Sequence, residues 1–282
     1  MYPPIAMDDP LTEQPDFLAV NRAMWDERAG INYRSAFYDV EGFRAGGARL
    51  RPHEIEEVGD VAGKDLLHLQ CHFGLDTLSW GRLGARVTGV DFSERAIAAA
   101  RQLASELGEP ATFVCCDVLD LPAHLDGAFD VVYTSYGVLG WLPDLTRWAQ
   151  VIAHFLRPGG TFYITELHPF VWPFDDSDGA ADLRVVFPYF AREAPLPFKV
   201  RGSYADPEAQ VEQTVEYCWP HSLGEVVTVL ASAGLRIELL HEWPFLVWPL
   251  PFLVEHPDRT WRLPVGMAGE IPLTFSLKAT KS

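Results

Sequence analysis

The chain has 282 residues, of which 48% are hydrophobic, and its formal net charge at pH 7 is −17. This length suits one large α/β domain, or one domain with a lid, because single hydrophobic cores stop growing near this size. Lys and Arg total 22, against 39 Asp and Glu, and nucleic-acid binding relies on basic residues that neutralise phosphates. We therefore expect no nucleic-acid partner.

The cysteine spacing argues against a metal site or a disulfide framework. The four cysteines include no CxxC pair; they are Cys71, Cys115, Cys116 and Cys218. Reduced thiols of this kind are typical of a cytoplasmic protein. Residues 1–10 have neither the basic region nor the apolar region of a secretory signal. The longest apolar stretch, Trp243 to Val254, is interrupted by three prolines and is too short to span a bilayer. It predicts a loop or a pocket wall, and we expect no membrane partner.

Residues 1–58 are predicted to form an N-terminal cap with helical and aromatic parts. Residues 1–15 contain four prolines and several acids and are expected to be frayed. From Asp16 to about Gly30, apolar residues recur at helical spacing. Residues 32–43 hold several aromatic side chains, which suggests packing over another part of the protein. Pro52 suits the first turn of a helix that ends at Val58.

Residues 59–168 alternate between short apolar runs and helical segments, which is typical of a Rossmann-like α/β core. The alternation predicts strands at 65–69, 86–90, 111–114, 129–134 and 161–166, and helices at 75–83, 93–107 and 145–156. Such alternation indicates βαβ units with right-handed crossovers and a parallel sheet. The strands are apolar throughout, as expected when helices cover both faces.

Residues 169–218 break this rhythm and are predicted to form a β-rich lid insertion. The segment is rich in proline, and three stretches could be strands of an antiparallel meander: 183–190, 198–204 and 210–217. The α/β pattern resumes in residues 219–282, which are expected to complete the core sheet. They predict a helix at 222–233 that Gly234 ends, a strand at 235–243 and a closing strand at 273–278.

The turn after the first predicted strand is a candidate cofactor site. It reads Gln70-Cys71-His72-Phe73-Gly74-Leu75-Asp76-Thr77. A nucleotide-like cofactor binds at the carboxyl ends of parallel strands, where glycine lets the backbone approach the ligand. Only Gly74 remains of a glycine-rich pattern, so the GxGxxG fingerprint of dinucleotide binding is absent. Taken alone, the turn fits an ordinary βα loop equally well.

Two further acids follow predicted strands. Asp91 ends the second strand, 17 residues after Gly74, where a carboxylate can accept hydrogen bonds from both ribose hydroxyls. A helix N-cap role shared with Ser93 is the alternative. After the third strand, Asp117 could accept from an adenine amino group while the Val118 amide donates. Phe92 could pack on the adenine ring. A solvated loop acid and a core ring are the alternatives.

The order and spacing of these segments resemble the class I S-adenosylmethionine-dependent methyltransferases. The segments are LHLQCHFGLDTL, VTGVDFSERAI, CCDVLDLP, FDVVYTSYGVLGWLPDL and LRPGGTFYITELHP. The resemblance covers residues 60–168 and continues more loosely to the end. It implies a seven-stranded, mostly parallel sheet with an antiparallel last strand, and S-adenosylmethionine as cofactor.

The resemblance also implies which residues bind the cofactor. The candidates are Tyr33, Gln70, Cys71, His72, Gly74, Asp76, Thr77, Asp91, Phe92, Asp117, Val118 and Ser135. His68 stands where the common pattern has an acid, and Gln70 and His72 stand where it has glycines. The last two side chains could hydrogen-bond the cofactor's carboxylate, or they could narrow the site. We expect no metal.

Methyl transfer needs a nucleophile held in line with the activated C–S bond, and a base only where the acceptor must lose a proton. The candidate catalytic residues are His168, Glu166, His221 and Tyr136. His168 leads because a histidine titrates near neutral pH, although a histidine before Pro169 could simply fix a turn. His221 could equally cap the following helix.

The sequence therefore predicts methyl transfer to a small-molecule acceptor, with O- or N-methylation of an apolar or aromatic metabolite favoured. One alternative is the same fold binding the cofactor but catalysing another reaction, or only binding ligand. A nicotinamide-dependent oxidoreductase is disfavoured because GxGxxG is absent. A protein or tRNA methyltransferase is disfavoured by the acidic charge and the predicted lid. Monomer and homodimer both remain open.

Overall fold

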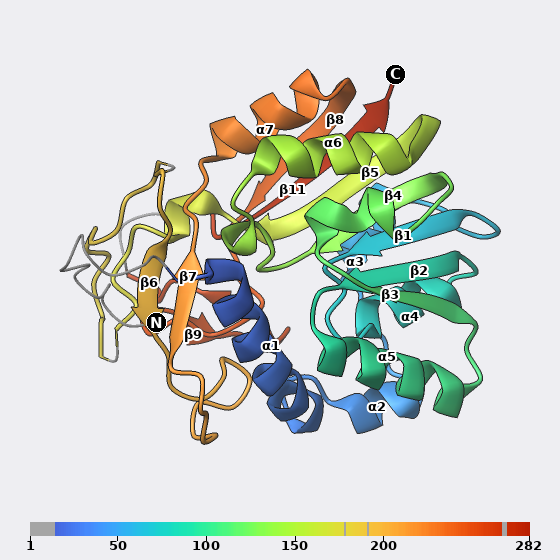
Figure 1. Ribbon diagram of the computed structural model, residues 1–282. Helices are drawn as coiled ribbons and strands as arrows, with labels where there is room; N and C mark the ends of the chain where they lie inside the picture. Colours follow the sequence, from blue (N-terminus) through green and yellow to red (C-terminus); the bar gives the residue numbers. More distant parts are fainter. Residues whose placement is uncertain (1–14, 178, 191, 267–269) are drawn as a thin grey trace.

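A seven-stranded sheet forms the centre of the computed structural model, which describes residues 15–177, 179–190, 192–266 and 270–282 (Figure 1). The strand order is β3-β2-β1-β4-β5-β11-β8. The strands are β1 (Asp65–Leu69), β2 (Arg86–Asp91), β3 (Ala111–Cys115), β4 (Phe129–Ser135), β5 (Leu156–Leu167), β8 (Leu235–Trp243) and β11 (Thr274–Lys281). Strands β1 to β5 pair in parallel, and β11 is antiparallel to both β5 and β8. The expected sheet with an antiparallel last strand is confirmed.

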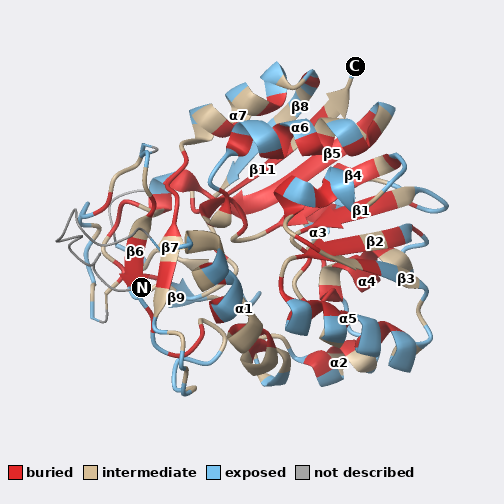
Figure 2. Ribbon diagram, viewed as in Figure 1, coloured by how far each residue is buried: buried red, intermediate tan, exposed pale blue. Residues whose placement is uncertain are grey.

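Helices cover both faces of the sheet, as the apolar strands predict. They include α3 (Pro52–Val58), α4 (Leu75–Arg82), α5 (Glu94–Leu107), α6 (Leu145–Phe155) and α7 (Leu223–Ser232). Neighbouring residues of β1 face opposite sides: Leu67 packs in the cluster that holds α6 and α7, whereas Leu66 packs with Val58 of α3 and Trp80 of α4. Ser93 caps α5 by accepting a hydrogen bond from the Ala96 amide, as expected. Figure 2 shows the buried sheet between helices whose outer faces are exposed.

The N-terminal cap is more helical than its sequence suggests. Helix α1 (Phe17–Arg34) extends beyond the predicted end, and α2 (Val40–Arg44) lies in the aromatic segment. Three short 3-10 helices were not foreseen: η1 (Val118–Ala123), η2 (Leu139–Trp141) and η3 (Pro169–Val171). The expectation of a frayed start falls on residues 1–15, of which 1–14 lie outside the described residues.

The three-stranded meander expected in the lid, residues 169–218, was wrong. Among the described residues of this segment, only β6 (Leu196–Lys199) and β7 (Val215–Cys218) pair as a ladder, which is antiparallel. The stretch 183–190 forms no strand, apart from an isolated bridge between Phe174 and Val185. This stretch contains Pro188, which lacks the N–H that a ladder needs.

A second insertion between β8 and β11 was not predicted as such. It holds a short hairpin of β9 (Val254–Glu255) and β10 (Trp261–Arg262). The apolar run before the hairpin contributes Trp248 and Leu250 to a cavity wall, so the expected pocket wall is confirmed. Within the described residues, no helix is long and apolar enough to cross a membrane.

Helix α1 runs beside the lid and joins it to the core (Figure 1). It contacts both α5 and β7. Several of its buried residues are polar, namely Asn21, Arg28 and Asn32. The Asn21 side chain donates to the Tyr217 carbonyl oxygen at 2.7 Å and accepts from the Tyr217 amide at 2.9 Å. The cap and the lid are therefore held together by buried hydrogen bonds.

Candidate active site

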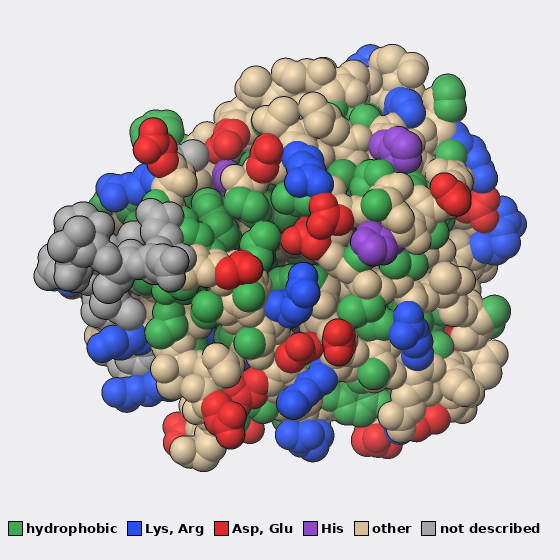
Figure 3. All heavy atoms as spheres, in the orientation of Figure 1, with side chains coloured by type: hydrophobic (Ala, Val, Ile, Leu, Met, Phe, Trp, Pro, Cys, Tyr) green, Lys and Arg blue, Asp and Glu red, His purple; other side chains and the backbone are tan. Residues whose placement is uncertain are grey.

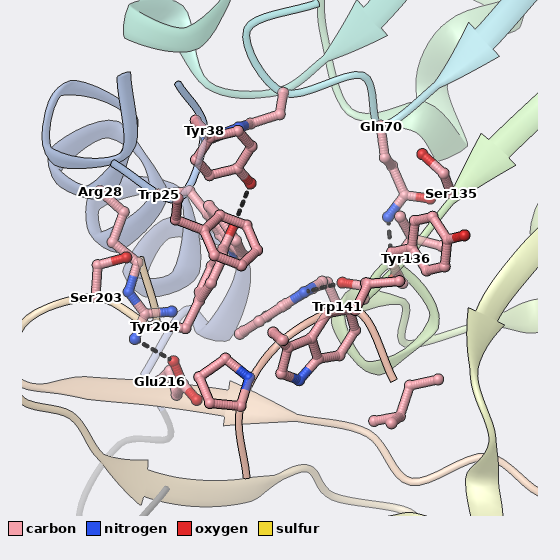
Figure 4. A pocket seen from close by; sticks show the side chains of 18 of the residues that line it. Trp25, Arg28, Tyr38, Gln70, Ser135, Tyr136, Trp141, Ser203, Tyr204 and Glu216 are labelled. Carbon is pink, nitrogen blue, oxygen red and sulfur yellow. Dashed lines mark hydrogen bonds and ion pairs between the residues drawn. The ribbon is translucent and has the colours of Figure 1, made fainter. Parts of the chain in front are cut away.

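A cavity of about 1590 Å³ lies at the carboxyl ends of the parallel strands. Gln70 after β1, Asp91 at the end of β2 and Tyr136 after β4 line its sheet side. Trp25 of α1 and Tyr204 of the lid line the opposite side (Figure 4). Pockets for a single ligand are typically about 300–1,000 Å³. This cavity therefore has room for a cofactor and an acceptor together, at the edge where open α/β sheets bind ligands.

The turn after β1 has an unusual backbone. Gln70 and His72 have φ angles of +55° and +52°, in the left-handed region that favours glycine. A hydrogen bond at 3.1 Å from Gln70 Nε2 to the Val138 carbonyl oxygen ties this turn to the loop after β4. Gly74 has φ of +80°, and a Cβ there would lie 2.8 Å from the Phe113 ring. Glycine is thus required at 74, whereas 70 and 72 adopt glycine-like backbone with side chains present.

Asp91 is held in the cavity wall by backbone hydrogen bonds, while Ser93 is the N-cap of α5. Its carboxylate accepts hydrogen bonds from the His72 amide at 2.8 Å and from the Ser93 amide at 2.9 Å. It lines the cavity although it is only 8% exposed, and this burial raises its pKa to about 6. A carboxylate has about four acceptor sites. Two of them therefore remain for a ligand's hydroxyls.

Three residues expected near an adenine ring are brought to the same cavity: Phe92, Asp117 and Val118. The Asp117 side chain also accepts from the Leu119 amide at 2.8 Å, so it caps η1. Together with Asp91, these residues form a continuous polar and aromatic edge that could hold a nucleoside.

Comparisons with known proteins point to one family. A model described as "Methyltransferase domain" matches residues 67–164. The ubiquinone biosynthesis O-methyltransferase of Chromobacterium violaceum is 32% identical over 119 residues, which are 42% of this chain and 51% of that protein. The Cronobacter sakazakii enzyme of the same name is 31% identical over 166 residues, 59% of this chain and 64% of that protein. The match thus spans between half and two thirds of these relatives.

Solved structures share the fold. An S-adenosylmethionine-dependent methyltransferase from Mesorhizobium loti has a TM-score of 0.57 at 22% identity, covering 81% of this chain and 96% of that one. Magnesium protoporphyrin IX methyltransferase from Synechocystis, with bound S-adenosylmethionine, has a TM-score of 0.53 at 14% identity, covering 96% and 100%. Residues 67–164 of the chain therefore match a methyltransferase domain, and the chain has the fold of the class I S-adenosylmethionine-dependent methyltransferases. S-adenosylmethionine is the cofactor of this family.

The turn after β1 has unused hydrogen-bonding groups that fit the amino acid end of S-adenosylmethionine. Within the described residues, Gln70 Oε1 and His72 Nε2 are buried without a hydrogen-bond partner, and both residues line the cavity. Burial lowers the pKa of His72 to about 3, so the imidazole is neutral. An orphaned buried polar atom is costly, and the cofactor's amino acid end offers partners for both.

Below this turn, a polar cluster takes the place of the family's usual acid. His68 Nδ1 lies 2.8 Å from Thr77 Oγ1, and burial lowers the pKa of His68 to about 3. Ser135 Oγ donates to Asp76 Oδ2 at 3.1 Å. His68, Asp76 and Ser135 line the cavity. Burial raises the Asp76 pKa, and the positive charge of Arg49 opposes that rise. Asp76 therefore supplies a carboxyl group close to His68, which stands where the common pattern has an acid.

Five candidate site residues are not among the described residues that line the cavity: Tyr33, Thr77, Glu166, His168 and His221. The Tyr33 hydroxyl accepts from Arg44 at 2.9 Å, and its ring packs on Phe73. Thr77 holds His68. Cys71, the last of the cofactor candidates, lines the cavity but is only 3% exposed, and burial raises the pKa of its thiol.

Glu166, His168 and His221, the other predicted catalytic residues, bond to backbone and are not among the described residues that line the cavity. The Glu166 carboxylate accepts from four backbone amides, those of Gly137, Val138, Leu139 and Leu167. His168 Nδ1 accepts from the Phe170 amide at 3.0 Å, which fixes the turn that starts η3. His221 Nε2 lies 2.8 Å from the Leu142 carbonyl oxygen. These three side chains position loops around the site.

Sequence reasoning missed two partners of Tyr136, the remaining catalytic candidate, of which Glu54 is buried and His53 half-buried. Its hydroxyl lies 3.2 Å from Glu54 Oε2 and 3.3 Å from His53 Nε2. Burial and the charge of Asp76 raise the pKa of Glu54 to about 7. The Glu54 carboxylate accepts from the Arg51 amide at 2.8 Å at the start of α3, but Arg51 does not fit the Ser/Thr-x-x-Glu signature, so Pro52 was the available signal. That signal marks a helix start and did not indicate burial.

Proposed function

We propose that this protein transfers the methyl group of S-adenosylmethionine to a small-molecule acceptor, with oxygen or nitrogen as the favoured target. One observation carries the proposal: Asp91, Phe92 and Asp117 meet at one side of a cavity whose other side is an aromatic chamber. The ubiquinone-related names of the relatives support O-methylation.

The cofactor's halves find complementary groups along the sheet edge. We place the ribose against Asp91 and the adenine between Phe92 and Asp117, and the amino acid end near Asp76 and Gln70. Bound there, the cofactor supplies a methyl group already activated on a sulfonium centre. Aromatic rings such as Trp25 suit a nearby cation.

The protein's own task is to orient the acceptor, exclude water and, where needed, take up a proton. Tyr136 is the one predicted catalytic side chain among the described residues that line the cavity. Its hydroxyl donates to Glu54 Oε2, whose pKa of about 7 suits proton transfer near neutral pH. We propose the Tyr136–Glu54 pair as the proton acceptor.

We also propose a cytoplasmic location and no nucleic-acid partner. The four cysteines are free thiols, which supports a cytoplasmic location. Figure 3 shows Lys and Arg interspersed with Asp and Glu over the visible face, so that face offers no extended basic surface for a nucleic acid.

The test is a turnover assay. Purified protein is incubated with S-adenosylmethionine and a panel of phenols and aryl amines, and S-adenosylhomocysteine is quantified. We expect the wild type to form S-adenosylhomocysteine only when an acceptor is present. The rate should fall in Tyr136→Phe, which keeps the ring but removes the hydroxyl. Cofactor binding without product from any acceptor would favour the alternative, a cofactor-binding protein with another reaction. The orphaned Gln70 and His72 side chains at the turn are the observation behind that alternative.

A further inference from the structure

A buried ion pair lies in the wall of the cavity that faces away from the sheet. Arg28 of α1 and Glu216 of β7 approach to 2.9 Å between the guanidinium Nη2 and Oε2, and their side chains are 9% and 4% exposed. Both residues line the cavity, and Figure 4 joins them by a dashed line on the side that holds Trp25 and Tyr204. A charge pair is therefore built into the wall beside these aromatic rings.

The pair has hydrogen-bonding capacity to spare. A guanidinium carries five N–H donors, and a carboxylate offers about four acceptor sites. Among the described residues, Arg28 Nε and Glu216 Oε2 have no hydrogen-bond partner, since the 2.9 Å contact between Oε2 and Arg28 Nη2 is an ion pair without hydrogen-bond geometry. One donor, Arg28 Nε, and one acceptor, Glu216 Oε2, are therefore unsatisfied in the cavity wall.

Holding the cap to the lid does not account for the pair. The two segments are already joined at the same place by the double hydrogen bond of Asn21 with the Tyr217 backbone. A buried ion pair is weak evidence for stability, because the cost of removing both charges from water can exceed their attraction. A role in binding explains why the pair lies against a cavity.

We propose that Arg28 and Glu216 recognise a neutral polar group of the acceptor that both donates and accepts hydrogen bonds, as a carboxamide or a hydroxyl does. The pair is electrically neutral, so a charged ligand group would leave an uncompensated charge in a buried place. A neutral donor and acceptor group satisfies both partners. This inference rests on the proposed function, since it assigns the acceptor's anchoring end.

The rest of the acceptor is apolar and planar. Trp25 and Trp141 cross edge to face at 5.3 Å between centroids, and Tyr204 packs on Trp25 at 6.3 Å. The Arg28 guanidinium lies 5.6 Å from the Trp25 ring. Aromatic faces of this kind favour an aromatic body, with the polar group pointing toward the ion pair.

The experiment compares three probes that share one ring system: 2-naphthamide, 2-naphthoate and 2-naphthylmethylamine. Their dissociation constants are measured by tryptophan fluorescence in protein saturated with S-adenosylhomocysteine. The amide is expected to bind about tenfold tighter than either charged probe, a difference of one decade in Kd. Equal binding of all three, or tighter binding of a charged probe, would overturn the proposal.

Charge variants then test the residues directly. Glu216→Gln keeps the shape but leaves Arg28 unpaired, so the preference should shift toward naphthoate. Arg28→Met should shift it toward the amine. The double variant Arg28→Met with Glu216→Leu removes both charges, so no unpaired charge remains buried. It should therefore fold even where a single variant does not, and it should lose the preference for the amide. Asp120→Asn, which breaks the exposed Arg147–Asp120 pair, is the control and should change nothing.

An unchanged order of probe affinities in variants that still bind S-adenosylhomocysteine would contradict the assignment. Wild-type protein that fails to bind S-adenosylhomocysteine would contradict the proposed function instead. In that case the affinities of the three probes would be measured without S-adenosylhomocysteine, and their order would still decide this proposal.

Discussion

The two walls of the cavity are built in different ways. The sheet wall consists of strand tips whose side chains bond to nearby backbone, such as Asp91 to the amides of His72 and Ser93. The cap and lid wall is held by side chains far apart in sequence, such as Asn21 and Tyr217, which are 196 positions apart. The first wall is set by local βα turns, whereas the second exists only once the chain has folded.

This difference separates two tasks. The sheet wall carries the groups expected to hold a cofactor, and a parallel sheet fixes them through its backbone. The cap and lid wall carries Trp25, Arg28 and Glu216, which face the space left for the acceptor. Such a wall can change its side chains without altering the sheet, so acceptor choice can vary while cofactor binding stays.

Removing Glu166 should have the largest effect and would break the sheet wall. In Glu166→Ala, four backbone amides around residues 137–139 and 167 lose their acceptor. Each buried unsatisfied group costs about 1–3 kcal/mol before relaxation, so we expect a loss of about 3–5 kcal/mol in the free energy of unfolding. Denaturant unfolding measures it, with Glu56→Ala, on the exposed surface, as control. A loss below about 1 kcal/mol would mean that Glu166 does not organise the loop.

Breaking the cap and lid wall at Asn21 should cost less. Asn21→Ala removes two hydrogen bonds to the Tyr217 backbone and should lower the free energy of unfolding by about 2 kcal/mol. Glu27→Ala is the matched comparison, because Glu27 also accepts from two lid amides, those of Glu212 and Gln213, but at a less buried position than Asn21. Its effect should be about 0.5 kcal/mol. Equal losses in the two variants would show that burial does not distinguish these contacts.

The sequence could predict the sheet wall because its signals are local. Apolar runs, Gly74 and the spacing to Asp91 lie within short segments; they predicted the strands and, through the family resemblance, the candidate cofactor residues, most of which line the cavity. The lid could not be predicted the same way. Its contacts with α1 depend on buried polar residues such as Asn21 and Arg28, which look like surface residues in a helical pattern. His168 and Glu166 looked catalytic by residue type, but only the fold shows that backbone amides occupy them.

The pH dependence of cofactor affinity should report on Asp91. Its raised pKa of about 6 means that protonation below pH 6 removes an acceptor for the ribose hydroxyls. Affinity for S-adenosylhomocysteine should therefore fall by up to about tenfold per pH unit below 6. As the pH falls through this range, protonation of Asp91 also stabilises the free folded protein, because the folded state binds the proton more readily than the unfolded state. Calorimetry from pH 7 to 5 measures the affinity, and Asp91→Asn should show no such slope. The same slope in both proteins would assign the effect to another group.

The smallest effect is expected from a helix cap outside both walls. Ser222 Oγ accepts from the Glu225 amide at 3.1 Å and starts α7. Ser222→Ala should cost about 1 kcal/mol of unfolding free energy and leave cofactor affinity unchanged. Thermal unfolding and one binding titration check both points. A change in affinity would mean that α7 communicates with the cavity.

The central claim is that the sheet wall holds S-adenosylmethionine through Asp91. Calorimetric titration of the wild type, Asp91→Ala and the exposed control Asp126→Ala with S-adenosylmethionine, S-adenosylhomocysteine and NADH tests it most directly. We expect micromolar binding of the two adenosyl ligands to the wild type and the control, a loss of at least about tenfold in Asp91→Ala, and no binding of NADH. Folded wild-type protein that binds neither adenosyl ligand, or an Asp91→Ala variant that binds them as tightly, would contradict it.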